Sequence, residues 1–356
     1  MISETIQAVC DNAIRSSRRG DTRSGIELAR QAYRLARRES PQAELAALNA
    51  SAICQGANGC FIEAIASAID AVRLARQHVN QRAATEALIT MAGAASFILE
   101  ADSVVLEMLA LCRAEADALA DKSLQVRIHN TFGLIYGNLA RFDDADREYD
   151  QGIALVDRAD TRASMLTPAY LMSGNRAYLS VQRARAATPE DFGPLVVDAE
   201  ARIRHVLGIA SAEMNIDAES RAFFCLGQLR TLQRQNVDAL QAFGEALTRA
   251  TQIRHHPRLI DTHIEIGKLH ASALQFDLAL EAMEAAFEFA DGNRPTAKVS
   301  TACEGIAAMY EKLGRQREAA HYHAKALRER EAFERDNEYA VRDLNSFWRS
   351  EAAQHA

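Results

Sequence analysis

Apolar residues recur along the chain at helical spacing, and small residues occupy fixed places within that pattern. Ala239, Ala279 and Ala319 lie 40 residues apart, and each follows a small residue by twelve positions. A second set of alanines follows seven residues later, at 246, 286 and 326. Two antiparallel helices can approach closely only where bulk is missing at their crossing. This register therefore predicts repeated pairs of packed helices.

The same spacing divides most of the chain into eight units. Gly93 and Gly133, again 40 residues apart, extend the register upstream. The interval between the fifth and sixth units is 52 residues, and the excess falls at 188–194, where Thr188 and Pro189 form a good helix start. We expect a lengthened first helix and a new start of the second helix there. The units begin near residues 6, 45, 86, 126, 168, 220, 260 and 300.

Large residues accompany the small ones at fixed places. Phe243 and Met283 occupy the twenty-fourth position of their units, and Tyr136 and Tyr310 the eleventh. This alternation resembles the tetratricopeptide repeat, most clearly over residues 134–145 and 309–315, although the first-helix Trp of that family is absent. The period of about 40 resembles the longer-helix variety found in bacterial regulators. The resemblance covers roughly residues 3 to 330. It implies an all-α fold, a right-handed α-solenoid of eight helix-turn-helix repeats over 1–327.

In this family the first helices line the inner, concave face of the superhelix. Transferred to this chain, the inward positions are mostly apolar in the first three units and become polar and longer from the fourth onward. Asn can pair with a peptide backbone, and Arg can grip a carboxylate with two hydrogen bonds. The alternative is an ordinary solvated helix face. The resemblance thus predicts a groove for a peptide or protein partner, formed by Arg127, Asn130, Asn138, Arg176, Arg221, Gln228 and Lys268.

The pattern changes after Leu327. Residues 328–356 contain no Gly or Pro, and a short apolar seam runs along an otherwise charged helix. The seam predicts either a helix that caps the solenoid or the start of a coiled coil that joins two chains as a homodimer. The arrangement also resembles bacterial signalling proteins in which a repeat region precedes a GGDEF-type cyclase, which implies the regulatory half of a longer protein. The seam consists of Phe333, Ala340, Leu344 and Phe347.

Composition narrows the class of function. The net charge of −7 argues against nucleic acid as a partner, because phosphate neutralisation needs a concentrated basic surface. The sequence contains no run of eighteen apolar residues, so no membrane span is predicted, and no signal peptide is apparent. The six cysteines contain no C-x-x-C pair and suit small core residues. We therefore expect a cytoplasmic protein with no nucleic-acid or membrane partner.

No catalytic motif stands out, and no cofactor is expected. His256, His263 and His270 are seven residues apart, which on a helix is about 10.5 Å and too far for one metal ion. The sequence predicts a non-enzymatic scaffold that binds a protein or peptide as a regulatory module in bacterial signalling. The alternative is a self-associating module that positions an output domain such as a diguanylate cyclase.

Overall fold

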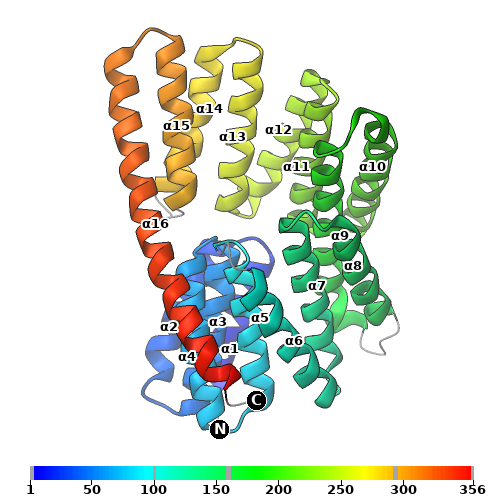
Figure 1. The fold of residues 1–356 in the computed structure, drawn as a ribbon, viewed down its shortest axis with the longest axis vertical. Helices are drawn as coiled ribbons and strands as arrows, with labels where there is room; N and C mark the ends of the chain where they lie inside the picture. The colour runs from blue at the N-terminus through cyan, green and yellow to red at the C-terminus, as the bar shows by residue number, and fades with distance from the viewer. Residues whose placement is uncertain (1–3, 99–101, 158–161, 292–295, 354–356) are drawn as a thin grey trace. The chain divides into compact units, whose positions relative to one another are not determined.

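The computed structural model describes residues 4–98, 102–157, 162–291 and 296–353. Over these ranges the chain forms sixteen α-helices and no strand, and the helices pack in consecutive pairs (Figure 1). The predicted all-α array of eight helical hairpins is confirmed. The first helix of each hairpin begins two to six residues before the expected start, and polar residues such as Ser40, Asn80, Asp121 and Asn215 cap four of these helices.

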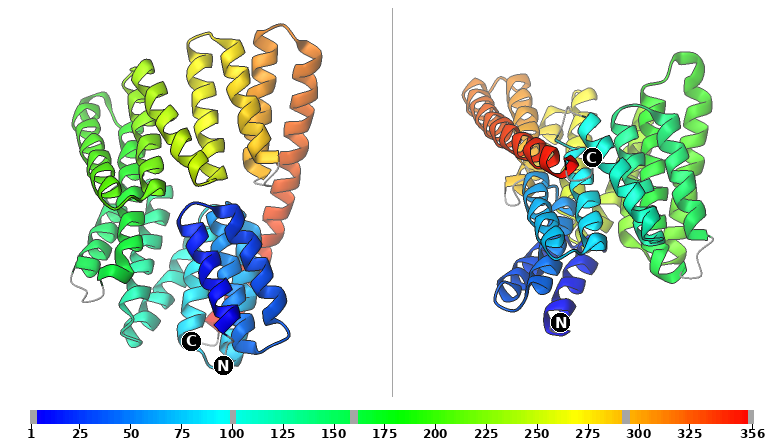
Figure 2. Two further views of the ribbon diagram at one scale, coloured as in Figure 1. Left: turned by 180° about the vertical axis from the view of Figure 1, so that it is seen from behind. Right: turned by 60° about the horizontal axis from the view of Figure 1, so that its bottom comes forward.

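The chain divides into two compact units, and the first contains Met1–Leu179 together with Asn337–Ala356. Helix α1 and the end of α16 therefore belong to the same unit (Figure 2). The helices of this unit are α1 (Glu4–Arg18), α2 (Thr22–Ala36), α3 (Pro41–Ala57), α4 (Phe61–Gln77), α5 (Gln81–Ala95), α6 (Asp102–Ala118), α7 (Lys122–Asn138) and α8 (Phe142–Asp157), with most of α9 (Arg162–Arg185) and the end of α16 (Gln316–Ala352).

The second unit is Ser180–Asp336. It holds the end of α9, α10 (Pro189–Ala212), α11 (Ile216–Leu232), α12 (Asn236–Gln252), α13 (His256–Ser272), α14 (Phe276–Asp291), α15 (Thr296–Lys312) and the beginning of α16. These units differ from the sequence-based division into 1–327 and 328–356, because α16 runs without interruption through residue 328. The sequence-based division stays a prediction.

Glycines at the helix crossings make room for large side chains of the partner helix. A Cβ atom on Gly227 would lie 2.5 Å from the ring of Phe243. Gly133 stands in the same relation to Tyr149, again at 2.5 Å, and Gly267 faces Met283. Contacts this short are impossible for a real Cβ atom. The large residues of the register thus fill the space that the small residues of the partner helix leave open.

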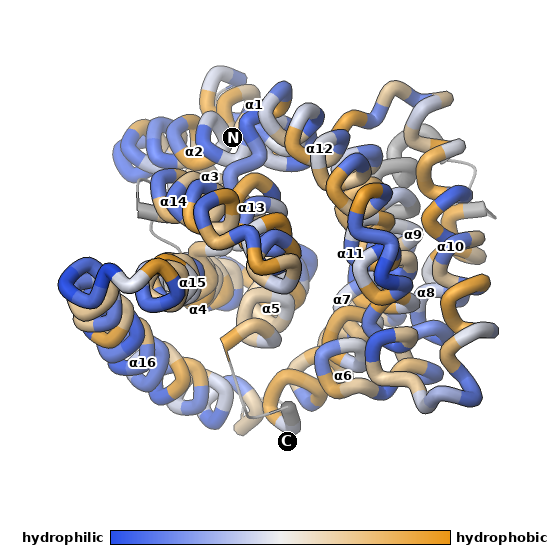
Figure 3. The backbone as a smooth tube through the Cα atoms, turned by 90° about the horizontal axis from the view of Figure 1, so that it is seen from above, coloured by the Kyte–Doolittle hydropathy of each residue, from blue (hydrophilic) through white to orange (hydrophobic). Residues whose placement is uncertain are grey.

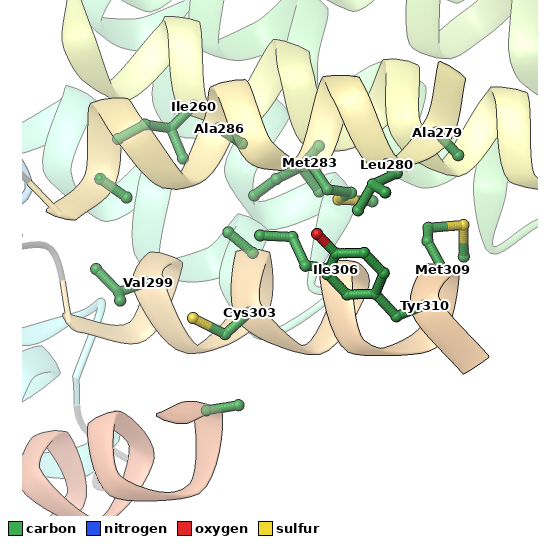
Figure 4. Packing of buried hydrophobic residues seen from close by; sticks show 14 of the residues in the cluster. Ile260, Ala279, Leu280, Met283, Ala286, Val299, Cys303, Ile306, Met309 and Tyr310 are labelled. Atoms are coloured by element: carbon green, nitrogen blue, oxygen red, sulfur yellow. The ribbon is translucent and has the colours of Figure 1, made fainter. Parts of the chain in front are cut away.

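Helices α13, α14 and α15 share a compact apolar core. Figure 4 shows Met283 of α14 facing Ile306 and Tyr310 of α15. Ala279 and Ala286, two of the small residues that define the register, are fully buried there. Their lack of bulk brings α14 close to its neighbours, and the larger side chains fill the remaining space.

Short turns of one recurring form connect many of the helices. The second residue after the helix end adopts a left-handed conformation, which suits Gly59 at φ 80° but is unusual for Val79 at φ 53°. After α4 the turn is closed by the N–H of Asn80, which donates to the carbonyl of Ala75 at 2.8 Å. The turn geometry is therefore set by backbone hydrogen bonds even where the residue is not glycine.

The fifth hairpin is longer than the others, as the interval of 52 residues predicts. Helices α9 and α10 each contain 24 residues, and Pro194 lies inside α10. Thr188 caps α10, since its hydroxyl oxygen accepts the N–H of Asp191 at 3.3 Å. The expected helix start at Pro189 is confirmed.

Hydropathy distinguishes α16 from the other helices. Figure 3 shows that hydrophilic segments dominate this helix. Within the described ranges, no helix has both the length and the apolar character needed to cross a lipid bilayer.

Candidate binding site

The predicted groove residues are distributed between the two units. Arg127 lies on α7 in the first unit, where its Nη1 atom pairs with Glu86 of α5 at 2.6 Å. Its Nη2 atom also donates to the hydroxyl of Thr90 at 2.9 Å. Burial lowers the pKa of the neighbouring Arg18, and the charge of Arg127 adds to this effect. Arg127 thus connects two first helices through an internal ion pair.

The two predicted asparagines also make contacts within the first unit. Asn130 accepts a hydrogen bond from the side-chain amide of Asn175 at 2.9 Å. Asn138 is exposed, and its Nδ2 atom donates to the carbonyl of Ser96 at 3.1 Å. Each amide therefore joins α7 to a neighbouring segment, and part of its hydrogen-bonding capacity is already used.

Arg176 of α9 is held between two carboxylates of α8. Its Nε atom lies 3.0 Å from Asp146, and its Nη1 atom lies 2.6 Å from Asp150. A guanidinium that already faces two acids has little affinity left for a third carboxylate. Arg176 therefore links α9 to α8 through two ion pairs, and its contact with a ligand stays a prediction.

The second unit holds Arg221, Gln228 and Lys268. Lys268 is exposed and pairs with Glu265 on its own helix at 2.9 Å. Gln228 is only 5% exposed, and its Oε1 atom has no hydrogen-bond partner among the described residues. Leaving such an acceptor unsatisfied typically costs about 1–3 kcal/mol. Gln228 is the predicted site residue whose environment in the free protein is least satisfied.

Arg221 belongs to a cluster of charged side chains between α11 and α13, which we call the Arg258 cluster. It consists of Asp217, Arg221, His255, Arg258 and Asp261. Burial lowers the pKa of Arg258, and the neighbouring Arg221 lowers it further, while the two aspartates oppose the shift. The two guanidinium groups are thus close neighbours in a partly desolvated environment.

Two members of the Arg258 cluster have unsatisfied atoms. The Nε atom of Arg258 has no partner among the described residues, although its guanidinium lies over the ring of Phe224 at 4.8 Å. The Oδ1 atom of Asp217 also lacks a hydrogen bond among the described residues, and it lies 3.7 Å from Nε2 of His255. Both atoms are buried, so each is desolvated without a compensating hydrogen bond to a described residue.

His255 orients one edge of this cluster. Its Nδ1 atom accepts the N–H of Arg258 at 3.1 Å and caps α13, so the neutral ring carries its proton on Nε2, toward Asp217. Burial lowers the pKa of His255 to about 4, and the attraction of Asp217 offsets only part of this shift. His255 is accordingly neutral at neutral pH.

A third cation lies beside the cluster. Lys298 of α15 pairs with Asp261 at 2.6 Å. Its Nζ atom also lies 3.4 Å from the carbonyl oxygen of Pro257, at the start of α13. Asp261 is therefore neutralised by Lys298, and three first helices, α11, α13 and α15, contribute charges to one region.

Sequence reasoning missed His255, Arg258 and Asp217. The available signal was the dipeptide before Pro257, which marks a helix start and places His255 at the capping position. Arg258 follows Pro257 in the first turn of α13, before the expected unit start near residue 260. Only the packing of α13 against α11 shows that it is close to Arg221.

The predicted C-terminal seam faces its own chain. Ala340, Leu344 and Phe347 are at most 7% exposed within the first unit, whereas Phe333 is only partly buried. The indole N–H of Trp348 donates to Glu107 of α6 at 3.1 Å. The end of α16 therefore packs against α6 and its neighbours rather than against the eighth hairpin.

Arg76 of α4 anchors this end of α16. Its Nε atom lies 2.6 Å from Glu351, and its Nη2 atom lies 2.7 Å from Glu115 of α6. Both carboxylates are less than 10% exposed. Burial alone would lower the pKa of Arg76, but its hydrogen bonds to the two carboxylates hold that pKa above its usual value.

The described residues form an all-helical array of consecutively paired helices. No protein-family model matches the sequence, and no curated protein does. Among solved structures, the chain is similar to aspartyl phosphate phosphatase F from Bacillus subtilis, with a TM-score of 0.51 and 12% identity over 93% of this chain and 95% of that one.

A second similar structure is the Rap conjugation gene regulator of the plasmid pLS20 in complex with the Phr* peptide. It has a TM-score of 0.51 and 13% identity, over 93% of this chain and 96% of that chain. Similarity at this level of identity establishes the common fold.

Proposed function

We propose that the chain is a non-catalytic scaffold that binds a peptide or protein segment along its first helices and acts as a regulatory module in the bacterial cytoplasm. The observation that carries the proposal is the buried, unsatisfied carboxamide oxygen of Gln228. In the free protein this buried oxygen makes no hydrogen bond to a described residue, which lowers stability. A polar residue of this kind is expected where a bound partner supplies the missing donor.

The backbone N–H of an extended segment is a suitable donor, because a peptide presents such groups at regular intervals. The fold is compatible with this role, since a regulator of similar fold is described with a bound peptide. The first-helix residues of the first unit are largely committed to internal pairs, as seen for Arg127 and Arg176. Gln228, the residue that carries the proposal, lies in the second unit, which is therefore the preferred location of the binding site.

The proposal can be tested with random peptides displayed to the immobilised full chain. Selected peptides are labelled, and their affinity is measured by fluorescence anisotropy for the wild type and for Gln228→Leu. We expect a loss of about fivefold to tenfold, which corresponds to one hydrogen bond. Because Leu removes an unsatisfied polar group, unfolding cannot account for this loss. Gln241→Leu, on the exposed face of α12, is the matched control.

Failure to select any peptide, or equal affinity in both variants and the wild type, would contradict the proposal. The alternative function, a self-associating module that positions a diguanylate cyclase or another output domain, requires Ala340, Leu344 and Phe347 to face a second copy. Those side chains are buried against their own chain. The binding function is therefore the one that the described contacts favour.

A further inference from the structure

A cleft of about 240 Å³ opens in the first unit between α6, α7 and α8. Each helix contributes residues that are three or four positions apart, which lie on the same side of a helix. Because one water molecule needs about 10–15 Å³, the cleft has room for a short chain of non-hydrogen atoms. The charges along its walls determine which chain fits.

An ion pair fills one end of this cleft. Nη2 of Arg113 lies 2.8 Å from Oε2 of Glu148, and Nδ1 of His129 lies 2.7 Å from the same oxygen. Burial alone would raise the pKa of Glu148, but its hydrogen bonds with His129 and Arg113 hold that pKa below the usual value. The charge of Arg113 is therefore balanced by an ionised carboxylate.

The other end of the cleft, one helical turn away, holds a carboxylate without a cation. Asp117 follows Arg113 by four residues on α6, and Gln125 precedes His129 by four on α7. Nε2 of Gln125 donates to Oδ1 of Asp117 at 2.7 Å. Asp117 is exposed and makes no ion pair with a described residue, although Lys122 lies one turn before Gln125. Its Oδ2 atom is thus open to a ligand.

Amide oxygens and apolar carbon accompany this carboxylate. Oε1 of Gln125 and the exposed amide of Gln151 make no hydrogen bond to a described residue. Leu155 follows Gln151 by four residues on α8 and lines the same cleft, and Ile128 of α7 adds a buried apolar surface. This end therefore combines a negative charge and several oxygen acceptors with an apolar wall.

We propose that the cleft binds an alkylammonium group, which a lysine side chain of a protein partner and a free aliphatic amine have in common. The three N–H donors of the ammonium match Oδ2 of Asp117 and the amide oxygens of Gln125 and Gln151. The methylene stem lies along Leu155, as lysine stems commonly cover apolar surface. This site is separate from Gln228, and the inference does not depend on the proposed function.

Other ligand classes fit the cleft less well. An anion would meet the uncompensated charge of Asp117, while Arg113 is already paired with Glu148. A metal ion needs several carboxylate, imidazole or thiolate ligands. Among the described residues, no group of three or more His, Cys, Asp or Glu side chains could hold one. A neutral alcohol would fill the space but leave the carboxylate without a counter-ion.

Titration of the full chain with n-butylammonium tests the inference. This probe has the ammonium and the stem of a lysine side chain, and n-butanol is its uncharged control. The side-chain amide signals of Gln125 and Gln151 are followed by NMR at low salt. We expect both signals to shift in a saturable way with n-butylammonium, and n-butanol to bind about threefold to fivefold more weakly, as one exposed ion pair implies.

Two variants assign the effect to the cleft. Asp117→Asn keeps the acceptor for Gln125 and removes the charge, so it should weaken n-butylammonium binding by about threefold to fivefold. Glu281→Gln removes an exposed carboxylate of α14 that makes no ion pair with a described residue, and it should leave binding unchanged. Equal affinity for the amine and the alcohol, or wild-type affinity in Asp117→Asn, would overturn the proposal.

Two further probes distinguish the sources of the group. Nα-acetyl-lysine amide carries it as a protein does, and cadaverine carries it as a free amine. Binding of acetyl-lysine amide at least as tight as that of cadaverine supports the proposal with a lysine of a protein partner as the source. Tighter binding of cadaverine supports it with a free amine. No saturable shift with any of the three ammonium probes would contradict it.

Discussion

Gly227 of α11 lies directly beneath the aromatic ring of Phe243 of α12, so close that no β-carbon fits between them. We expect Gly227→Ala to destabilise the second unit by about 1–3 kcal/mol, because the ring must move or the helices must separate. Gly244→Ala is the matched control: Gly244 lies inside the partner helix α12, but nothing lies within 4 Å of the added carbon. There the better helix propensity of Ala should raise stability by up to about 1 kcal/mol. Urea denaturation of both variants checks the difference in sign.

Val79 offers a test of backbone strain. This β-branched residue is 91% exposed and has a φ of 53°, so its side chain gains little from contacts while its backbone is disfavoured. We expect Val79→Gly to raise the free energy of unfolding by about 0.5–1 kcal/mol. Val197→Gly, at an exposed position inside α10, should lower it by about 1 kcal/mol. Equal effects of the two substitutions would show that the turn at Val79 is not strained.

The buried pair of carboxylates around Arg76 predicts a strong charge effect. Arg76→Met leaves Glu115 and Glu351 without their cation, which should cost about 3–5 kcal/mol in the first unit. Hydrogen exchange in α4 and in residues 337–352 measures this loss locally. The triple variant Arg76→Met, Glu115→Gln, Glu351→Gln should recover at least half of it, since no charge is then left buried. Lack of recovery would assign the effect to lost packing of the Arg76 side chain.

His255 predicts a pH dependence confined to the second unit. Its pKa in the folded chain is about 4, below its usual value of 6.5, so the unfolded chain binds the proton more strongly. Stability is therefore fully present above pH 6.5 and falls as the pH decreases toward 4. At pH 5 the loss attributable to His255 is about 2 kcal/mol. His255→Asn keeps a helix cap without a titrating group, and its stability should change correspondingly less between pH 7.5 and 5.

The periodic part of the fold could be predicted from the sequence because packing between adjacent helices requires small and large residues at a fixed, short spacing. A helix crossing needs Gly or Ala on one helix and a large residue sixteen positions later, as at Gly227 and Phe243. The same constraint recurs at Gly133 with Tyr149 and at Gly267 with Met283, and it can be read by spacing alone. The contact between Trp348 and Glu107 follows no such spacing. The two residues are 241 positions apart, and their pairing is not repeated along the chain.

The candidate site could be predicted only in part. Inward positions follow from the repeat register, which identified Arg221 and Gln228. Whether an inward cation is available depends on acids from neighbouring helices, such as Asp146 and Asp150 around Arg176, and these partners follow no fixed spacing. The residues that make the second unit distinctive, His255 and Arg258, lie where a proline shapes the helix start.

The continuity of α16 has a consequence for synthesis of the protein. The ribosome completes Leu179 and then makes the whole second unit before it reaches Asn337, yet the segment from Asn337 onward belongs to the first unit. Until that segment emerges, the nascent chain carries Arg76 and Glu115 without Glu351, and Glu107 without Trp348. The part of the protein that is translated first is thus the last to be completed, and it must remain protected from misassembly for most of the time of translation.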